Sequence, residues 1–100
     1  MDYRIIKSPS KSTMDIIMRR IANGVITNLD HVDAVGLVQG KVIEMICAVD
    51  IAEKAVGVTV ADIKGNCPQN IISIAIFGDT VAVEVAMQEI KCKLEEGKVL

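Results

Sequence analysis

One polar loop, Lys64 to Asn70, carries the side chain of this 100-residue chain that is best placed for chemistry. Cys67 stands in the middle of the loop, between two apolar, strand-like runs at 58–63 and 71–77. Glycine and asparagine tolerate left-handed backbone, and Pro68 fixes its own φ and pushes Cys67 toward an extended conformation. The sequence therefore predicts a tight connection between two strands, with a thiol at its tip.

The cysteines predict neither a disulfide framework nor a metal site within one chain. They are Cys47, Cys67 and Cys92, an odd number, widely spaced and without a C-x-x-C pair. Cys47 and Cys92 fall in expected helices, on or near apolar faces, where a cysteine usually packs as a small hydrophobic residue. From spacing alone, the simpler interpretation of Cys67, a small residue in a turn, is favoured.

Several classes of function are not expected. There is no Ser-His-Asp set, glycine-rich phosphate loop or carboxylate cluster, and the single histidine, His31, has no partner for catalysis, so the chain does not read as an enzyme. A net charge of −2 and the lack of a basic cluster with aromatics argue against nucleic acid. We expect no membrane segment and no signal peptide, and hence a cytoplasmic protein.

Composition bounds the architecture. The length suits one compact domain. Apolar residues make up 51% of the chain and aromatics 2%, so the core must consist of Val, Ile, Ala and Met. Such an apolar monomer has few polar residues with which to cover itself, and this favours an oligomer with buried interfaces.

The first part of the chain, residues 1–32, predicts a strand, a helix and a linker. A short strand at 3–7 is followed by a helix at 13–22, for which Ser12 is the expected N-cap. The apolar residues of this helix fall at i, i+3, i+4 and i+7 on one face: Met14, Ile17, Met18 and Ile21. Asn23-Gly24 is the expected helix end. Residues 25–32 are an expected linker, in which Val25-Ile26 could pair as a short strand.

The second part, residues 33–97, predicts a β-α-β-β-α core. Strands are expected at 33–39, 58–63 and 71–77, and helices at 41–56 and from about 80 to 96, the second capped by Asp79 or Thr80. The expected apolar faces of the two helices are Val42, Met45, Ile46, Val49 and Ala52, and Val83, Ala86, Met87, Ile90 and Leu94. With the extra strand and helix in front, the chain is predicted to form a single ferredoxin-like α/β sandwich in a shuffled order, spanning residues 1–100.

Nearly the whole chain, from Tyr3 to Leu94, resembles the bacterial microcompartment shell domain. The resemblance rests on Ala34-Val35-Gly36-Leu37-Val38, on the helix with Ala48 to Ala55, and on the G-D-x-x-A-V signature at 78–83. In the common order of that family a strand and a short helix come last. Here the strand at 3–7 and the helix at 13–22, which match these two elements, come first in the chain, as in the circularly permuted shell proteins.

The resemblance implies a cyclic hexamer that joins other shell proteins in the coat of an enzyme-filled organelle in the cytoplasm. The pore loop on its six-fold axis would be Gly65, Asn66, Cys67, Pro68 and Gln69. This loop looks like that of an iron–sulfur-binding shell protein from microcompartments that use a glycyl-radical enzyme for propanediol breakdown. Cys67 would then ligate a [4Fe–4S] cluster shared between subunits, for electron transfer or cluster delivery to encapsulated redox enzymes.

Two details of the family pattern stay open in this sequence. Shell subunits often place a lysine at the edge where hexamers meet, and Lys41 and Lys54 both qualify. The permuted relatives often carry an N-terminal barrel-forming extension, which is not evident here.

Two other functions are compatible with the sequence. The first is the same shell hexamer with an ordinary pore for small polar metabolites. The second is an unrelated ferredoxin-like regulatory domain that binds a metabolite at a subunit interface, since this sandwich hosts many functions.

Overall fold

The computed structural model describes residues 1–21, 32–65 and 70–96. Three helices and four strands follow one another in the order β1 (Asp2–Lys7), α1 (Lys11–Arg20), β2 (Ala34–Lys41), α2 (Val42–Glu53), β3 (Val58–Ile63), β4 (Ile71–Gly78) and α3 (Thr80–Glu96). Three features predicted from the sequence lie outside the described residues. They are the helix end at Asn23-Gly24, His31, and the linker at 25–32 apart from its last residue, Val32. None of the described helices is long and apolar enough to cross a membrane.

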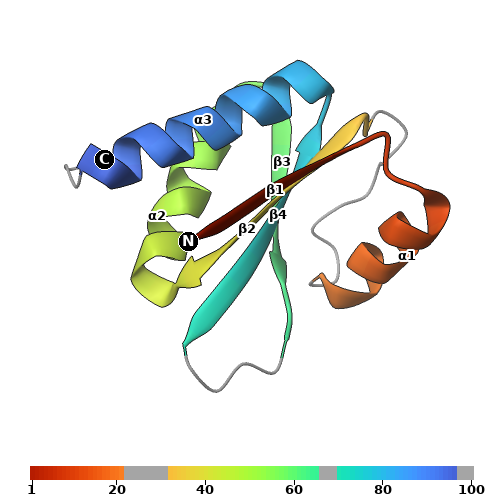
Figure 1. Cartoon of the computed structure of the whole chain (residues 1–100), viewed down its shortest axis with the longest axis horizontal. Coiled ribbons are helices and arrows are strands. Elements are labelled where there is room, and N and C mark those ends of the chain that lie inside the picture. Colours follow the sequence, from red (N-terminus) through yellow and green to blue (C-terminus); the bar gives the residue numbers. More distant parts are fainter. Residues whose placement is uncertain (22–31, 66–69, 97–100) are drawn as a thin grey trace.

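The strands form one antiparallel sheet in the order β1-β2-β4-β3 (Figure 1). Because β2 and β3 both run antiparallel to β4, they are parallel to each other, and β4 lies between them. This split β-α-β arrangement is the mark of a ferredoxin-like sandwich. The predicted α/β sandwich is therefore confirmed, with β1 added at one edge beside β2.

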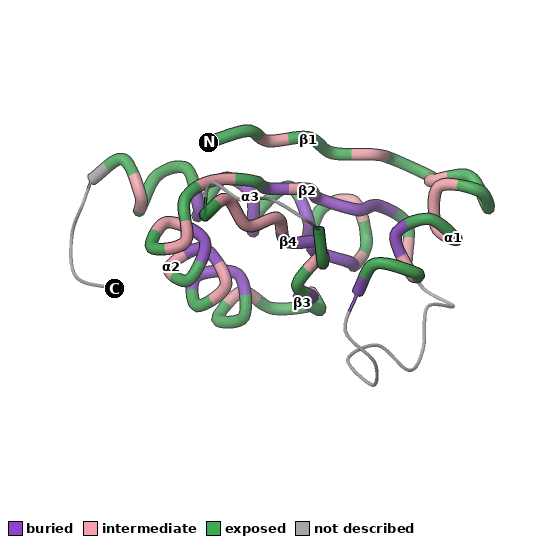
Figure 2. The backbone as a smooth tube through the Cα atoms, turned by 90° about the horizontal axis from the view of Figure 1, so that it is seen from below, coloured by how far each residue is buried: buried purple, intermediate pink, exposed green. Residues whose placement is uncertain are grey.

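The two faces of the sheet are covered unequally, as Figures 1 and 2 show. Helices α2 and α3 pack on one face, where Val38, Met45, Ile76 and Ile90 are among the buried residues of the larger core. Helix α1 covers part of the other face with a smaller apolar cluster. The end of that face near Gln39 and Ser73 is left open.

The predicted apolar face of α1 is confirmed, but its predicted N-cap is wrong. Ile17 and Ile21 are buried, and Met14 and Met18 are half-buried against the same cluster. The helix begins at Lys11, and its N-cap is Ser10, whose hydroxyl accepts a hydrogen bond from the Thr13 N–H at 3.2 Å. Two serines stand two residues apart in the sequence, and Ser12 lies inside the first helical turn.

The predicted apolar stripe of α2 is only partly correct. Met45 and Ala52 are buried as expected, and so are Ala48 and Ile51, but Ile46 is 63% exposed. Helix α2 is apolar on almost every side, so the 3.6-residue period does not single out one face. The helix face that packs on the sheet is decided by tertiary contacts.

The predicted start and face of α3 are confirmed. Of the two expected caps, Asp79 is the one used, because its Oδ1 accepts a hydrogen bond from the Ala82 N–H at 2.8 Å. Val83, Ala86, Met87 and Ile90 are buried and Leu94 packs against them. Gly78, just before the cap, has no room for a side chain, since an added Cβ would lie 2.7 Å from the carbonyl oxygen of Gly57. The Gly-Asp pair of the signature thus has a structural role, which is close packing followed by helix capping.

Candidate functional site

The loop between β3 and β4 is held at one end of the sheet by described residues on both sides. The last pair between the two strands is Ile63 with Ser73, and Lys64, Gly65 and Asn70 continue beyond it. Asn70 adopts a left-handed backbone with φ 58°, as the asparagine at this place predicted. The other predicted pore-loop residues, Asn66, Cys67, Pro68 and Gln69, lie outside the described residues.

Two backbone hydrogen bonds tie the ends of this loop to helices on opposite faces of the sheet. The Val42 N–H donates to the carbonyl oxygen of Asn70 at 3.1 Å, so the loop ends against the first turn of α2. The Lys64 N–H donates to the carbonyl oxygen of Arg20 at 2.6 Å, at the end of α1. The two described ends of the loop, Lys64 and Asn70, are therefore each fixed to a helix.

Polar side chains surround the base of the loop on the open sheet face. The Ser73 hydroxyl donates to Oε1 of Gln39 at 2.9 Å, between neighbouring strands. These two residues line a cavity of about 560 Å³ beside the loop, together with Asp62, Lys64, Gly65 and three isoleucines, Ile63, Ile71 and Ile72. The lining thus combines one acidic and one basic side chain with apolar surface, so it does not favour ions of one sign.

An apolar surface lies beside the same loop, at the start of α2. Ile43 and Ile46 are 73% and 63% exposed and line a shallow depression together with Lys41 and Asn70. The start of α2 is fixed in place, because Oε1 of Glu44 accepts a hydrogen bond from the Lys41 N–H at 3.0 Å. Sequence reasoning missed this surface, because it assigned Ile46 to the core.

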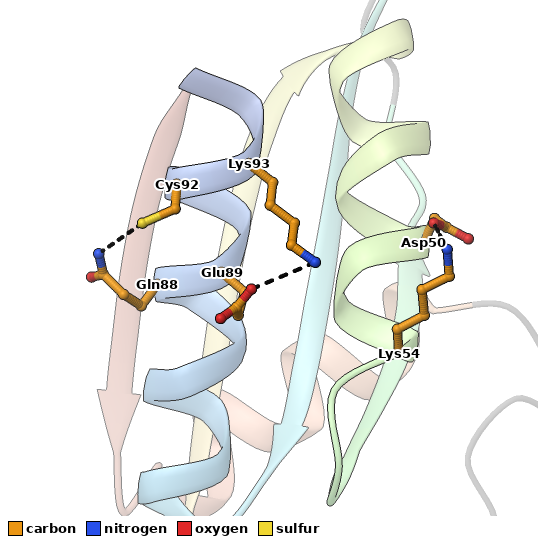
Figure 3. Close-up of polar contacts among 6 residues, drawn as sticks. All are labelled: Asp50, Lys54, Gln88, Glu89, Cys92 and Lys93. Atoms are coloured by element: carbon orange, nitrogen blue, oxygen red, sulfur yellow. Dashed lines mark hydrogen bonds and ion pairs between the residues drawn. The ribbon is translucent and has the colours of Figure 1, made fainter. Parts of the chain in front are cut away.

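The two cysteines that the structure describes lie on helices and not at the loop. Cys47 is half-buried on α2, and Cys92 is exposed on α3, where its Sγ lies 3.5 Å from Nε2 of Gln88 (Figure 3). Within residues 1–21, 32–65 and 70–96, no three His, Cys, Asp or Glu side chains gather as a metal site. Cys67 is the one cysteine in the loop, so a single copy of the loop cannot supply the four thiolates that a [4Fe–4S] cluster usually takes. Such a cluster fits this donor set only if several chains share it.

The two lysines considered for a hexamer edge lie at opposite ends of α2. Lys41 precedes the helix next to the loop. Lys54 follows the helix at the far end, where its Nζ pairs with Oδ2 of Asp50 at 2.8 Å (Figure 3). A ring with the loops at its centre would therefore have Lys54 toward its outer edge.

Comparison with solved structures identifies relatives of the whole domain. The chain is 54% identical to the GrpU microcompartment shell protein from Clostridiales bacterium 1_7_47FAA, solved ligand-free, with a TM-score of 0.76 over 97% of this chain and 95% of that one. It is 32% identical to the ligand-free GrpU shell protein from Pectobacterium wasabiae, with a TM-score of 0.74 over 90% of this chain and 99% of that one. No protein-family model matches the chain, and no curated protein does. The likeness in sequence and fold extends over almost the full length of both relatives, and the chain therefore belongs to the bacterial microcompartment shell proteins.

Proposed function

We propose that this protein is a structural subunit of a microcompartment shell and closes into a cyclic hexamer with its 65–69 loops around a central pore. The observation that carries the proposal is the 54% identity to a shell protein over 97% of the chain. The exposed Ile43 and Ile46 support it, because a neighbouring copy that covers them would stand next to the loop. Other shell proteins are the expected partners of the assembled ring, and the function is structural and not catalytic.

The cysteines of several loops together bind an iron–sulfur cluster at this pore. One Cys67 per chain is too few, but copies that converge on an axis bring several thiolates within reach of one cluster. Six-fold symmetry does not match a cubane, so only a subset of the cysteines would ligate it. A [4Fe–4S] cluster, when bound, supplies one-electron redox chemistry, which suits electron transfer or cluster delivery across the shell to encapsulated redox enzymes. The loop motif resembles that of shells with a propanediol-cleaving glycyl-radical enzyme.

The experiment is anaerobic purification of the wild type, Cys67→Ser and Cys92→Ser, with iron analysis and visible absorbance. Cys92→Ser is the matched control, because Cys92 is an exposed thiol on α3, outside the loop. We expect brown wild type and Cys92→Ser with bound iron, and a colourless Cys67→Ser. Native mass spectrometry of all three should give the hexamer. Iron that survives Cys67→Ser at full occupancy rules out this ligand.

A plain pore for small polar metabolites is the second candidate. The polar side chains of Gln39, Asp62, Lys64 and Ser73, which line the cavity beside the loop together with three isoleucines, favour it. A wild-type hexamer that stays colourless and iron-free after anaerobic purification and reconstitution would support this function over the cluster. A regulatory domain instead predicts a dimer whose melting temperature shifts with a metabolite.

The circular permutation is part of the proposal, and the position of β1 supports it. β1 is an edge strand next to β2 and lies beside α3, where Lys7 Nζ pairs with Oε1 of Glu84 at 3.1 Å and Lys91 Nζ lies 4.8 Å from the centroid of the Tyr3 ring. A strand connected after α3 could occupy the same edge. Moving this strand from the end of the chain to its front would therefore leave the sheet unchanged.

A further inference from the structure

A second cavity lies on the open face of the sheet, where α1 does not cover the strands. Four of its residues form one row across the sheet, because Asp2 pairs with Gln39, Gln39 with Ser73, and Ser73 with Ile63. Cross-strand partners point to the same face of a sheet, so these side chains are neighbours. They line a cavity of about 350 Å³, here called the sheet-face cavity, which has the size of a small-molecule site.

The amide of Gln39 is held in one orientation at the middle of this row. Its Oε1 accepts the hydrogen bond from the Ser73 hydroxyl at 2.9 Å. The Nε2 of the same amide carries two N–H groups. Within the described residues no hydrogen bond uses them, so Gln39 offers oriented donors to an acceptor in the cavity.

One positive and one negative side chain of β1 line the same cavity. Arg4 follows Asp2 by two residues, so both side chains lie on one face of the strand, about 6.5 Å apart along it. Nη1 of Arg4 donates to the carbonyl oxygen of Tyr3 at 2.7 Å, which uses one of five guanidinium N–H groups. Neither Asp2 nor Arg4 belongs to an ion pair of the described part of the chain.

The rest of the lining is apolar and consists of Leu37, Val38 and Ile63. Leu37 and Ile63 are half-buried beside the smaller apolar cluster, so part of each side chain is exposed to the cavity side of the sheet. Polar side chains on an open sheet face need no partner but water. Here, however, a donor amide, two opposite charges and apolar surface converge on one hollow, which is the composition of a ligand site.

We propose that the sheet-face cavity binds a short aliphatic α-amino acid in its zwitterionic form. The carboxylate of the ligand accepts hydrogen bonds from the Arg4 guanidinium and from Nε2 of Gln39, and its ammonium group donates to the carboxylate of Asp2. Its aliphatic side chain lies against Leu37 and Ile63.

The two charges of the lining select this class of ligand. A molecule with a single charge would meet a like charge at Asp2 or at Arg4, whereas a zwitterion satisfies both. The proposal goes beyond the structural role in a shell, and it uses residues of β1, β2, β3 and β4 within one chain.

The test is saturation-transfer difference NMR on the full-length protein, which suits a large assembly. The probes are 2-aminobutyrate and two analogues that each lack one charge, butyrate and propylamine. The variants are Arg4→Gln and Asp2→Asn. Arg19→Gln is the matched control, because Arg19 is also exposed and donates to a backbone carbonyl, that of Asp15, but lies on α1 outside the cavity.

We expect saturable binding of 2-aminobutyrate, and binding of butyrate and propylamine that is weaker by about ten-fold. Arg4→Gln and Asp2→Asn should each weaken 2-aminobutyrate by about ten-fold, whereas Arg19→Gln should stay within about two-fold of the wild type. Butyrate that binds as tightly as 2-aminobutyrate overturns the proposal, because the cavity would then attract anions only. Equal weakening by Arg4→Gln and Arg19→Gln, or no saturable binding to the wild type, overturns it as well. Circular dichroism of each variant confirms that a loss of binding is not a loss of fold.

Discussion

The N–H of Val42, the first residue of α2, donates a hydrogen bond to the carbonyl oxygen of Asn70, the last residue of the loop that carries Cys67. Asn70 holds this carbonyl in place with a left-handed backbone, φ 58°. The helix that presents Ile43 and Ile46 is therefore attached directly to the loop. A ring contact at these isoleucines would fix the positions of neighbouring loops relative to one another.

The first prediction concerns the backbone of Asn70. A β-branched residue is strained at positive φ, so Asn70→Val should lower the free energy of unfolding by about 1–2 kcal/mol. Asn70→Gly should keep it within about 0.5 kcal/mol of the wild type, because glycine adopts this backbone freely. Urea denaturation at one fixed protein concentration measures both variants. An equal loss in both would show that the side chain of Asn70, and not its φ, matters.

The second prediction concerns ring closure. Lysine in place of Ile43 or Ile46 puts a charge into a surface that is buried in the proposed ring, and a buried unpaired charge is strongly unfavourable. We expect the double variant Ile43→Lys/Ile46→Lys to be a folded monomer or dimer in native mass spectrometry. The proposed iron–sulfur cluster should also be lost although Cys67 is intact, because that cluster needs cysteines from several chains.

The control for ring closure is Ile16→Lys, at an isoleucine on α1 that is 50% exposed on the other side of the sheet. It should keep both the ring and the iron. A double variant that still forms the wild-type ring would place the contact between neighbours elsewhere on the surface.

The fold could be predicted from the sequence where local signals are unambiguous. β3 has the predicted bounds, 58–63, because it is a β-branched run bounded by Gly57 and by the polar loop. For the cap of α3, side-chain chemistry narrows the choice to Asp79 or Thr80, and the structure selects Asp79. The α1 cap could not be decided in the same way, because Ser10 and Ser12 are equally good caps and only the path of the chain selects Ser10.

The candidate site could be predicted only in part. The two strands that flank the loop and the left-handed backbone of Asn70 follow from the sequence. The exposed apolar surface of Val56 and Val81 could not be found in this way, because the two valines come from elements that meet only in the folded chain. The exposure of Ile46 could not be predicted either. Helix α2 has apolar residues both on the side that packs on the sheet and on the side that faces away from it.

The third prediction concerns Gly36 of β2, which lies under α3. A Cβ at this position would stand 2.8 Å from Sδ and 3.3 Å from Cγ of Met87, and 3.1 Å from Cγ1 of Val83. Gly36→Ala should therefore overpack the core and destabilise the protein by about 1–3 kcal/mol. Met87→Ala alone leaves a cavity and should cost about 2–5 kcal/mol.

The double variant Gly36→Ala/Met87→Ala tests whether this contact is the cause. It should cost less than the sum of the two single variants, by about 0.5–3 kcal/mol, because the new methyl enters space that Met87 has left. Thermal and urea unfolding measure all four proteins of the cycle. Strict additivity would mean that Gly36→Ala acts through Val83 or the backbone and not through Met87.

The last prediction concerns Tyr3, which joins the edge strand β1 to the core under α2 and α3. Burial raises the pKa of the Tyr3 phenol above its usual 10.0, and the carboxylates of Glu95 and Glu44 raise it further. The folded chain thus holds the phenolic proton more tightly than the unfolded chain does. The corresponding contribution to stability is fully present below pH 10.0, which is the pKa of Tyr3 in the unfolded chain. It is lost as the pH rises through the higher pKa of Tyr3 in the folded chain.

Alkaline titration of the phenolate absorbance checks this directly, because Tyr3 is the one tyrosine and the chain has no tryptophan. The native midpoint should lie above 10.0 and fall to about 10 in denaturant, where burial and the carboxylates no longer act. Glu95→Gln should move the native midpoint toward 10.0, whereas Asp15→Asn on α1 should leave it in place. A native midpoint at or below the denatured one would mean that the positive charge of Lys91, 4.8 Å from the ring centre, outweighs burial, and that stability rises instead of falling across this pH range.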